Sequence, residues 1–329
     1  MNYVSFLNSL FKEEVEKADN LAIFGQNITL GSCLGGLCRG LKVKKNGLII
    51  NSPNVENTLV GLGFGAMLNN VNTIFFVKQL DFVLLGIDPL VNTYNYIRRL
   101  KPTASFTIVP TIVDIPYQGH QSSLNNLPDF CSIARIPGYV LTNQHDAEDL
   151  IRSQLVKPGF RFLCPSHRFY KEPLISFEQI YFKANDFSVY QFMRGQDATV
   201  VTFNFTLPQG IELIYYLRER NVKASLFNIT LASQVNWQPI LEEVQLSKQL
   251  IVLDDTKGTQ FTSDQLILEA LKHCQIESLQ VLRRDFSGIE WLCPNPEILT
   301  VDYASVHSNL LKKLSEQPAK LNFLKATGH

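Results

Sequence analysis

Glu56 is the residue whose type and position indicate chemistry most clearly. It lies between an apolar, strand-like run at 47–50 and a small-residue, helix-like run at 59–68. An unpaired charge is costly to bury, so a carboxylate at the mouth of an apolar helix is either held neutral or given a partner. Both possibilities indicate a functional site. The alternative is that Glu56 simply starts the helix, where a negative charge interacts favourably with the helix dipole.

Other sequence motifs that could carry chemistry are sparse. The six cysteines are scattered, no pair has a CxxC spacing, and Cys33 and Cys38 have no histidine close by. We therefore expect reduced thiols and no metal site on this chain. No P-loop or Ser-His-Asp order is found. The spacing of Gly61, Gly63 and Gly65 differs from that of a dinucleotide-binding loop and favours close helix packing instead.

The elements that must position these residues follow from hydrophobic periodicity. Short apolar runs alternate with helical patterns, which is typical of an α/β fold with a largely parallel sheet. Asp254 and Asp255 end one such run, where they could contact a ligand, although capping of a helix is the favoured interpretation. We expect strands at 21–24, 73–77, 105–109, 139–141, 161–163, 198–203, 224–228, 249–253 and 278–282, and helices at 81–100, 146–155, 208–220 and 265–273.

A break in this pattern indicates two domains. The regular alternation is lost between residues 170 and 190 and then resumes. We therefore expect a first domain at 1–175, a linker at 176–195 and a second domain at 196–329. A chain of 329 residues is long enough for two domains.

Composition excludes several classes of protein. The 329 residues include 30 basic and 30 acidic side chains, so the chain lacks the basic excess that nucleic-acid binding requires. Apolar residues make up 45% of it, and a neutral, apolar-rich chain is typical of an assembly. No apolar stretch reaches membrane-spanning length, and the charged N-terminal segment resembles neither a signal nor a transit peptide. These features predict a cytoplasmic protein that binds neither membranes nor nucleic acid.

Several short motifs, taken in order, resemble one enzyme family. The motifs are Arg39-Gly40-Leu41, Pro53-Asn54-Val55-Glu56, Gly61 with Gly65, Leu80-Asp81-Phe82, Ile87-Asp88-Pro89-Leu90-Val91-Asn92 and Ile136-Pro137-Gly138-Tyr139-Val140. The family pattern aligns from Glu56 to Asn92 without a gap. With these motifs the chain resembles the beta subunit of the thiamine-diphosphate-dependent decarboxylase component of 2-oxo acid dehydrogenase complexes.

The resemblance implies an architecture and a cofactor site. The fold would be two three-layer α/β/α domains, a transketolase-like pyrimidine-binding domain followed by a transketolase C-terminal-like domain. Glu56 would hydrogen-bond a ring nitrogen of the cofactor's aminopyrimidine and stabilise its imino tautomer, the internal base that generates the reactive ylide. Leu80 and Phe82 would contact the cofactor, with the Phe82 ring against the pyrimidine face. Ordinary core packing is the alternative for Phe82.

The resemblance also implies a partner chain. The superfamily holds Mg²⁺ and the cofactor's diphosphate with a Gly-Asp-Gly element, and this sequence contains no such element. An alpha-type decarboxylase subunit would therefore supply the Mg²⁺ site, in a heterotetramer that acts on a 2-oxo acid. A lipoyl acyltransferase is a further candidate partner.

Some positions depart from the family pattern. Counting back from the Pro-Gly turn places Asn125 at the family's active-site histidine, and the nearest histidine, His120, needs a five-residue shift to replace it. His120 is our candidate for that catalytic role, and a surface-loop histidine is the alternative. Gln26-Asn27 and Cys164-Pro165-Ser166-His167 stand where the family has acidic residues, and Asn228-Ile229-Thr230-Leu231 replaces an arginine-threonine segment.

These departures keep two further functions open. One is a subunit of a thiamine-dependent carbon–carbon ligase, in which the same cofactor transfers an acyl group in biosynthesis. The other is a non-catalytic scaffold that retains the fold and binds an alpha-type chain.

Overall fold

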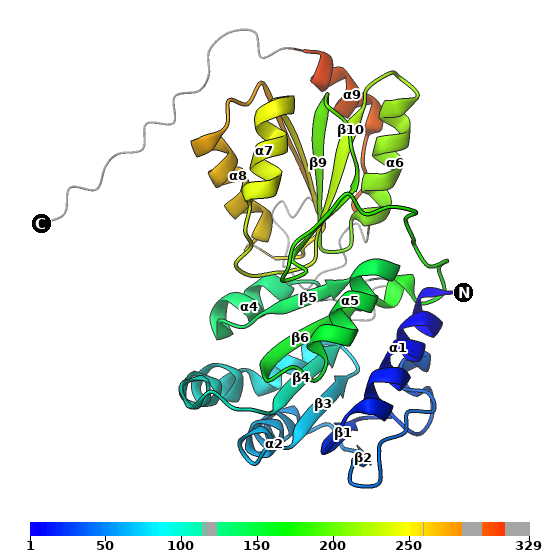
Figure 1. The fold of residues 1–329 in the computed structure, drawn as a ribbon, viewed down its shortest axis with the longest axis vertical. Helices are drawn as coiled ribbons and strands as arrows, with labels where there is room; N and C mark the ends of the chain where they lie inside the picture. The colour runs from blue at the N-terminus through cyan, green and yellow to red at the C-terminus, as the bar shows by residue number, and fades with distance from the viewer. Residues whose placement is uncertain (114, 116–123, 259, 285–297, 313–329) are drawn as a thin grey trace, which may run out of the picture.

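The computed structural model describes residues 1–113, 115, 124–258, 260–284 and 298–312 as two α/β units, one above the other in Figure 1. Each unit has a six-stranded sheet, and Figure 1 shows helices on both faces of each sheet. The expected α/β fold with two largely parallel sheets is confirmed. No described helix is both long and apolar enough to cross a membrane.

The first unit has a fully parallel sheet in the order β2-β1-β3-β4-β6-β5. Helices α1 and α5 pack together on one face of it, while α2 and α4 lie on the other (Figure 1). Its strands are β1 (Leu21–Gly25), β2 (Leu48–Asn51), β3 (Asn72–Val77), β4 (Ser105–Pro110), β5 (Gly138–Leu141) and β6 (Gly159–Pro165), and its longer helices are α1 (Tyr3–Lys17), α2 (Glu56–Leu68), α4 (Leu127–Ala134) and α5 (Gln144–Gln154).

Burial explains why the inner strands of this sheet are largely apolar. Every residue of β4 is buried, because helices cover both faces of a parallel sheet. Gly63 lets α2 lie directly on this strand, since a Cβ there would stand 2.3 Å from the Phe106 ring. The close packing expected of the glycines therefore holds for Gly63, whereas Gly61 and Gly65 face open space.

The segment expected to be one helix at 81–100 is a series of short helical pieces. They are η2 (Leu80–Gly86), the π-helical η3 (Pro89–Thr93), α3 (Tyr94–Ile97) and η4 (Arg98–Leu100). Pro89 has no amide hydrogen to continue an α-helical ladder, which accounts for the change of geometry at that point.

The second unit has a mixed sheet in the order β12-β11-β9-β10-β8-β7. The pairs from β12 to β10 are parallel, whereas β8 runs antiparallel to both β10 and β7. Its elements are β7 (Phe182–Lys183), β8 (Val189–Met193), β9 (Ala198–Phe203), α6 (Leu207–Arg218), β10 (Ala224–Ile229), α7 (Gln238–Ser247), β11 (Gln249–Asp254), α8 (Thr262–His273), β12 (Ser278–Arg283) and α9 (Tyr303–Leu311).

Two separate cores stabilise the second sheet. One cluster of buried residues packs α6 and α9 against one face, and the other packs α7 and α8 against the opposite face. Within the range 176–195, expected as a linker, β7 and β8 pair with the second sheet. The domain boundaries themselves stay a prediction.

Backbone hydrogen bonds join the two units. The Val140 amide donates to the Thr230 carbonyl, and the Ala232 amide donates to the Gly138 carbonyl, both at 2.8 Å. The edge strand β5 thus pairs with the 230–232 segment of the second unit, which covers a sheet edge that would otherwise be open.

Candidate functional site

Glu56 is the first residue of α2, and its side chain points into the protein. Only 4% of the residue is exposed. Its Oε2 has no hydrogen-bond partner among the described residues. Buried polar atoms are nearly always paired, so an unpaired carboxylate oxygen at a helix start indicates a place for a ligand rather than a structural contact. The burial disfavours the alternative that Glu56 merely caps α2 in solvent.

The η2 segment places Leu80 and Phe82 beside the start of α2. Gly86, the last residue of η2, lies so close that a Cβ there would stand 3.3 Å from the Glu56 carbonyl oxygen. The Leu80 amide donates to the Thr111 carbonyl at 3.0 Å, which ties η2 to the end of β4. Leu80 is fully buried, whereas Phe82 is partly exposed and packs on the first unit's core. Both geometries suit the roles expected from the resemblance, and those roles stay predictions.

Only Asn125, of the two candidates for the family's active-site histidine, lies in the described part of the chain. His120 lies outside the described residues. Asn125 is fully buried and takes part in the contact between the two units. Its Oδ1 accepts from Asn204 Nδ2 at 2.5 Å, its Nδ2 donates to the Asp255 carbonyl at 3.3 Å, and its carbonyl accepts from the Lys257 amide at 2.6 Å. Asn125 therefore holds the two units together.

A buried ion-pair cluster lies at the same junction. Asp255, directly after β11, is paired with Arg168 of the first unit, and Arg284 Nη2 lies 3.7 Å from Asp255 Oδ2. Burial opposes ionisation of Asp255, but the two arginines outweigh it and hold the pKa of this carboxyl below its usual range. Asp254 instead accepts from Ser263 Oγ at 2.6 Å and from the Thr256 amide at 3.0 Å. Within the described part of the chain, helix α8 has no side-chain cap hydrogen bond, so the expected capping role is not seen for Asp254.

Asp146 forms a second buried polar group between the units. Its carboxylate accepts from the Asn143 amide of its capping box at 3.2 Å, from the Thr142 amide at 2.9 Å and from Asn228 Nδ2 of β10 at 3.4 Å. Complete burial raises the pKa of Asp146 to about 7, and the hydrogen bonds from Thr142 and Asn143 offset part of that rise.

A cavity of about 220 Å³ opens at the carboxyl ends of four strands of the first sheet. Asn27 follows β1, Lys78 follows β3, Thr111 follows β4 and His167 follows β6, and all four residues line it. In open α/β sheets this edge is where ligands bind, above all where the strand order reverses, as it does between β1 and β3 here. We did not single out Lys78 from the sequence, although its place one residue after an expected strand was a usable signal.

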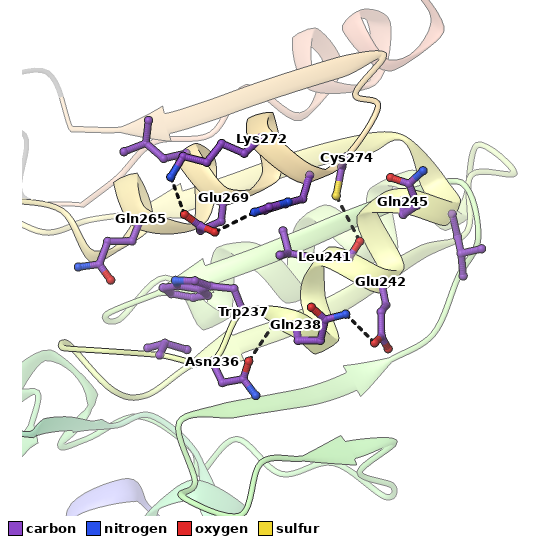
Figure 2. Close-up of a pocket in the computed structure, with 14 residues that line it drawn as sticks. Asn236, Trp237, Gln238, Leu241, Glu242, Gln245, Gln265, Glu269, Lys272 and Cys274 are labelled. Atoms are coloured by element: carbon purple, nitrogen blue, oxygen red, sulfur yellow. Dashed lines mark hydrogen bonds and ion pairs between the residues drawn. The ribbon is translucent and has the colours of Figure 1, made fainter. Parts of the chain in front are cut away.

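A larger groove of about 890 Å³ lies between α7 and α8 on the second unit (Figure 2). Its polar side chains bond one another: Glu269 pairs with Lys272 at 2.8 Å and with His273 at 3.3 Å. Cys274 Sγ donates to the Leu241 carbonyl at 3.4 Å. Among the described residues, no group of three or more His, Cys, Asp or Glu side chains could hold a metal ion.

Curated relatives of low identity align with most of the chain. No protein-family model matches it. The 2-oxoisovalerate dehydrogenase subunit beta of Bacillus subtilis (strain 168) is 20% identical over 286 residues, 83% of this chain and 85% of that protein. The acetoin:2,6-dichlorophenolindophenol oxidoreductase subunit beta of Cupriavidus necator is 21% identical over 309 residues, 88% and 87% of the two chains. The pyruvate dehydrogenase E1 component subunit beta of Mycoplasma genitalium is 18% identical over 274 residues, 81% and 83% of the two chains.

Solved structures give the same fold. A split gene transketolase, an inactive beta4 tetramer, has a TM-score of 0.70 at 12% identity, covering 94% of this chain and 97% of that chain. The transketolase of Campylobacter jejuni has a TM-score of 0.66 at 8% identity, over 87% of this chain and 42% of that chain. The solved structures confirm the transketolase-like fold. The curated relatives bear out the resemblance drawn from the motifs: over most of its length the chain is similar, at 18–21% identity, to beta subunits of the 2-oxo acid dehydrogenase type.

Proposed function

We propose that this chain is the beta-type subunit of a thiamine-diphosphate-dependent 2-oxo acid decarboxylase or dehydrogenase. It would bind the aminopyrimidine half of the cofactor at an interface with an alpha-type chain in a heterotetramer, and the alpha-type chain would hold Mg²⁺. The observation that carries the proposal is Glu56, a nearly buried carboxyl with one oxygen unpartnered within the described structure. The names of the relatives support the reaction class.

The residues around Glu56 fit the proposed cofactor half. A carboxyl group is the side chain that can share a proton with a ring nitrogen, and its low exposure keeps water from competing for that hydrogen bond. The partly exposed Phe82 ring can pack on a flat heterocycle, and the buried Leu80 would close the pocket below it. When bound, thiamine diphosphate would supply the carbanion chemistry. His120 remains a proposed catalytic residue.

Apolar side chains on α2 and η2 support a partner chain. Leu62, in the middle of α2, is 51% exposed, and Leu84 and Leu85, on η2, which contacts α2, are 43% and 63% exposed. Large apolar side chains grouped at one place on a surface are typical of protein contacts. The split gene transketolase is inactive as a beta4 tetramer, which is consistent with a beta-type chain that needs a second kind of chain for activity.

The decisive experiment compares Glu56→Gln with wild type in the complex formed with the co-purifying alpha-type chain. We expect turnover of the 2-oxo acid substrate to fall by about 10²–10⁴-fold, the range typical of a lost proton-transfer group. The control is Glu16→Gln, since Glu16 is exposed on α1 and should be replaceable without effect. Turnover of Glu56→Gln equal to that of wild type would defeat the proposal.

The non-catalytic scaffold remains the rival function, because Asn125 stands at the family histidine position and is engaged in the contact between the units. Calorimetric titration of the wild-type complex with thiamine diphosphate and Mg²⁺ separates the two. Saturable heat that disappears in Glu56→Gln supports the enzyme subunit. An absence of heat in the wild-type complex would favour the scaffold.

A further inference from the structure

We propose that the 220 Å³ cavity at the carboxyl edge of the first sheet binds a small oxyanion, a carboxylate or a phosphate group, through Lys78 and His167. Glu56, Leu80 and Phe82 do not line this cavity, although the carbonyl of Thr111, which does, accepts from the Leu80 amide. The inference goes beyond the proposed function, because it assigns to this chain a ligand chemistry of its own.

The charge of the cavity lining carries the first step. Lys78 and His167 both line it, and its lining residues in the described part of the chain include no Asp or Glu. Lys78 has no ion-pair partner among the described residues, and the His167 side chain has no hydrogen-bond partner there. Lys78 is exposed and His167 is half-buried, and a cation beside a cavity that no carboxylate lines within the described chain favours an anionic occupant.

The remaining polar side chains carry the second step. Tyr170 and Thr111 are both nearly buried in the cavity wall, and their hydroxyl oxygens lie 3.0 Å apart. Ser32 and Asn27, on the loop after β1, also line the cavity. Hydroxyl and amide groups of this kind can donate to oxyanion oxygens, which accept several hydrogen bonds at once.

The packing of the cavity carries the third step. The His167 and Tyr170 rings are 5.1 Å apart between centroids, so the imidazole is supported on one side by a buried ring. Gly35 adopts a positive φ of +67° beside the same ring, where a Cβ would stand 3.0 Å from Tyr170 Cε2. Gly35 thus permits a close approach without filling the cavity. At about 220 Å³ the space suits a small metabolite or one group of a larger one.

The sequence departures support the same interpretation. Asn27 and His167 lie in the two first-unit segments where acidic residues were expected from the resemblance, and the fold brings both to this one cavity.

Calorimetric titration of the full chain, in complex with its partner where it co-purifies with one, tests the inference with inorganic phosphate and with pyruvate as probes. We expect saturable binding of at least one probe, weakened about tenfold in Lys78→Met and in His167→Gln. Lys78→Arg, which keeps the charge, should retain binding. Lys45→Met is the matched control, because Lys45 is exposed and outside the cavity. Wild-type affinity should also fall as ionic strength rises.

Each result of these titrations either supports or overturns the proposed oxyanion site. Binding of phosphate but not pyruvate identifies a phosphorylated ligand. The reverse identifies a carboxylate when Lys78→Met and His167→Gln weaken it, whereas pyruvate binding that these two variants leave unchanged belongs to the proposed active site and overturns the inference. Absence of heat with both probes, or equal affinity in wild type, Lys78→Met and His167→Gln, would overturn the inference. Glu56→Gln should leave this affinity unchanged. Oxyanion binding in a wild-type complex that gives no heat with thiamine diphosphate and Mg²⁺ would therefore count against the proposed function alone.

Discussion

Two buried polar regions of this protein differ in how their charges are paired. At the junction between the units, Asp255 is paired with Arg168 and approached by Arg284, and it also accepts from Asn204 Nδ2 at 2.9 Å. At the start of α2, Glu56 is nearly as deeply buried, yet its Oε2 has no partner in the described structure.

This difference separates structural charge from functional charge. A buried ion that is fully hydrogen-bonded within the chain contributes to the fold and has no capacity left for a ligand. A buried carboxyl with an unpaired oxygen weakens the fold and is kept where a ligand completes it. From this difference we make three further predictions about the free energy of unfolding, from the largest expected effect to the smallest.

Removing the junction carboxylate should have the largest effect on stability. We expect Asp255→Ala to lower the free energy of unfolding by about 3–5 kcal/mol, the usual result of breaking a buried ion pair from one side. Urea denaturation of the full chain measures it. The control is Asp19→Ala, which breaks the exposed Lys44–Asp19 pair and should cost at most about 1 kcal/mol. Equal effects of the two substitutions would remove the distinction between the regions.

Asp146 should make the junction sensitive to pH. Its pKa is about 7 in the folded protein and near 3.8 when exposed, so the folded state binds the extra proton between these values. The stability it contributes is therefore complete below about pH 4 and is lost as pH rises to about 7, with a slope of at most about 1.4 kcal/mol per pH unit. Asp146→Asn should lose this slope. Parallel profiles of variant and wild type in urea denaturation between pH 4 and 7 would contradict the assignment.

Glu56→Gln should have the smallest effect on stability. Because no described residue pairs with Oε2, exchanging the carboxylate for an amide should change the free energy of unfolding by no more than about 1 kcal/mol in either direction. The same denaturation measurement applies. A loss comparable to that of Asp255→Ala would mean that Glu56 supports the fold, and the distinction between the two regions would disappear.

Sequence reasoning located the elements well where burial is local and periodic. The runs at 73–77 and 198–203 became β3 and β9, because fully buried parallel strands are continuous apolar segments. It treated residues 81–100 as one helix, since periodicity does not reveal how Pro89 divides the backbone into short pieces. It also left β8 unassigned, because the pairing of β8 with β10 depends on contacts far apart in the chain.

The functional residues also divide into those that the sequence located and those that only the fold brought together. Local sequence signals were enough to place a carboxylate at the start of a glycine-rich helix, because the apolar runs on either side of Glu56 define the strand and helix that flank it. The folded chain was needed to show that Asn125 and Asp255 meet at the junction and that Asn27, Lys78 and His167 surround one cavity. Strand order brings together side chains that are distant in the chain, and hydrophobic periodicity carries no information about that order.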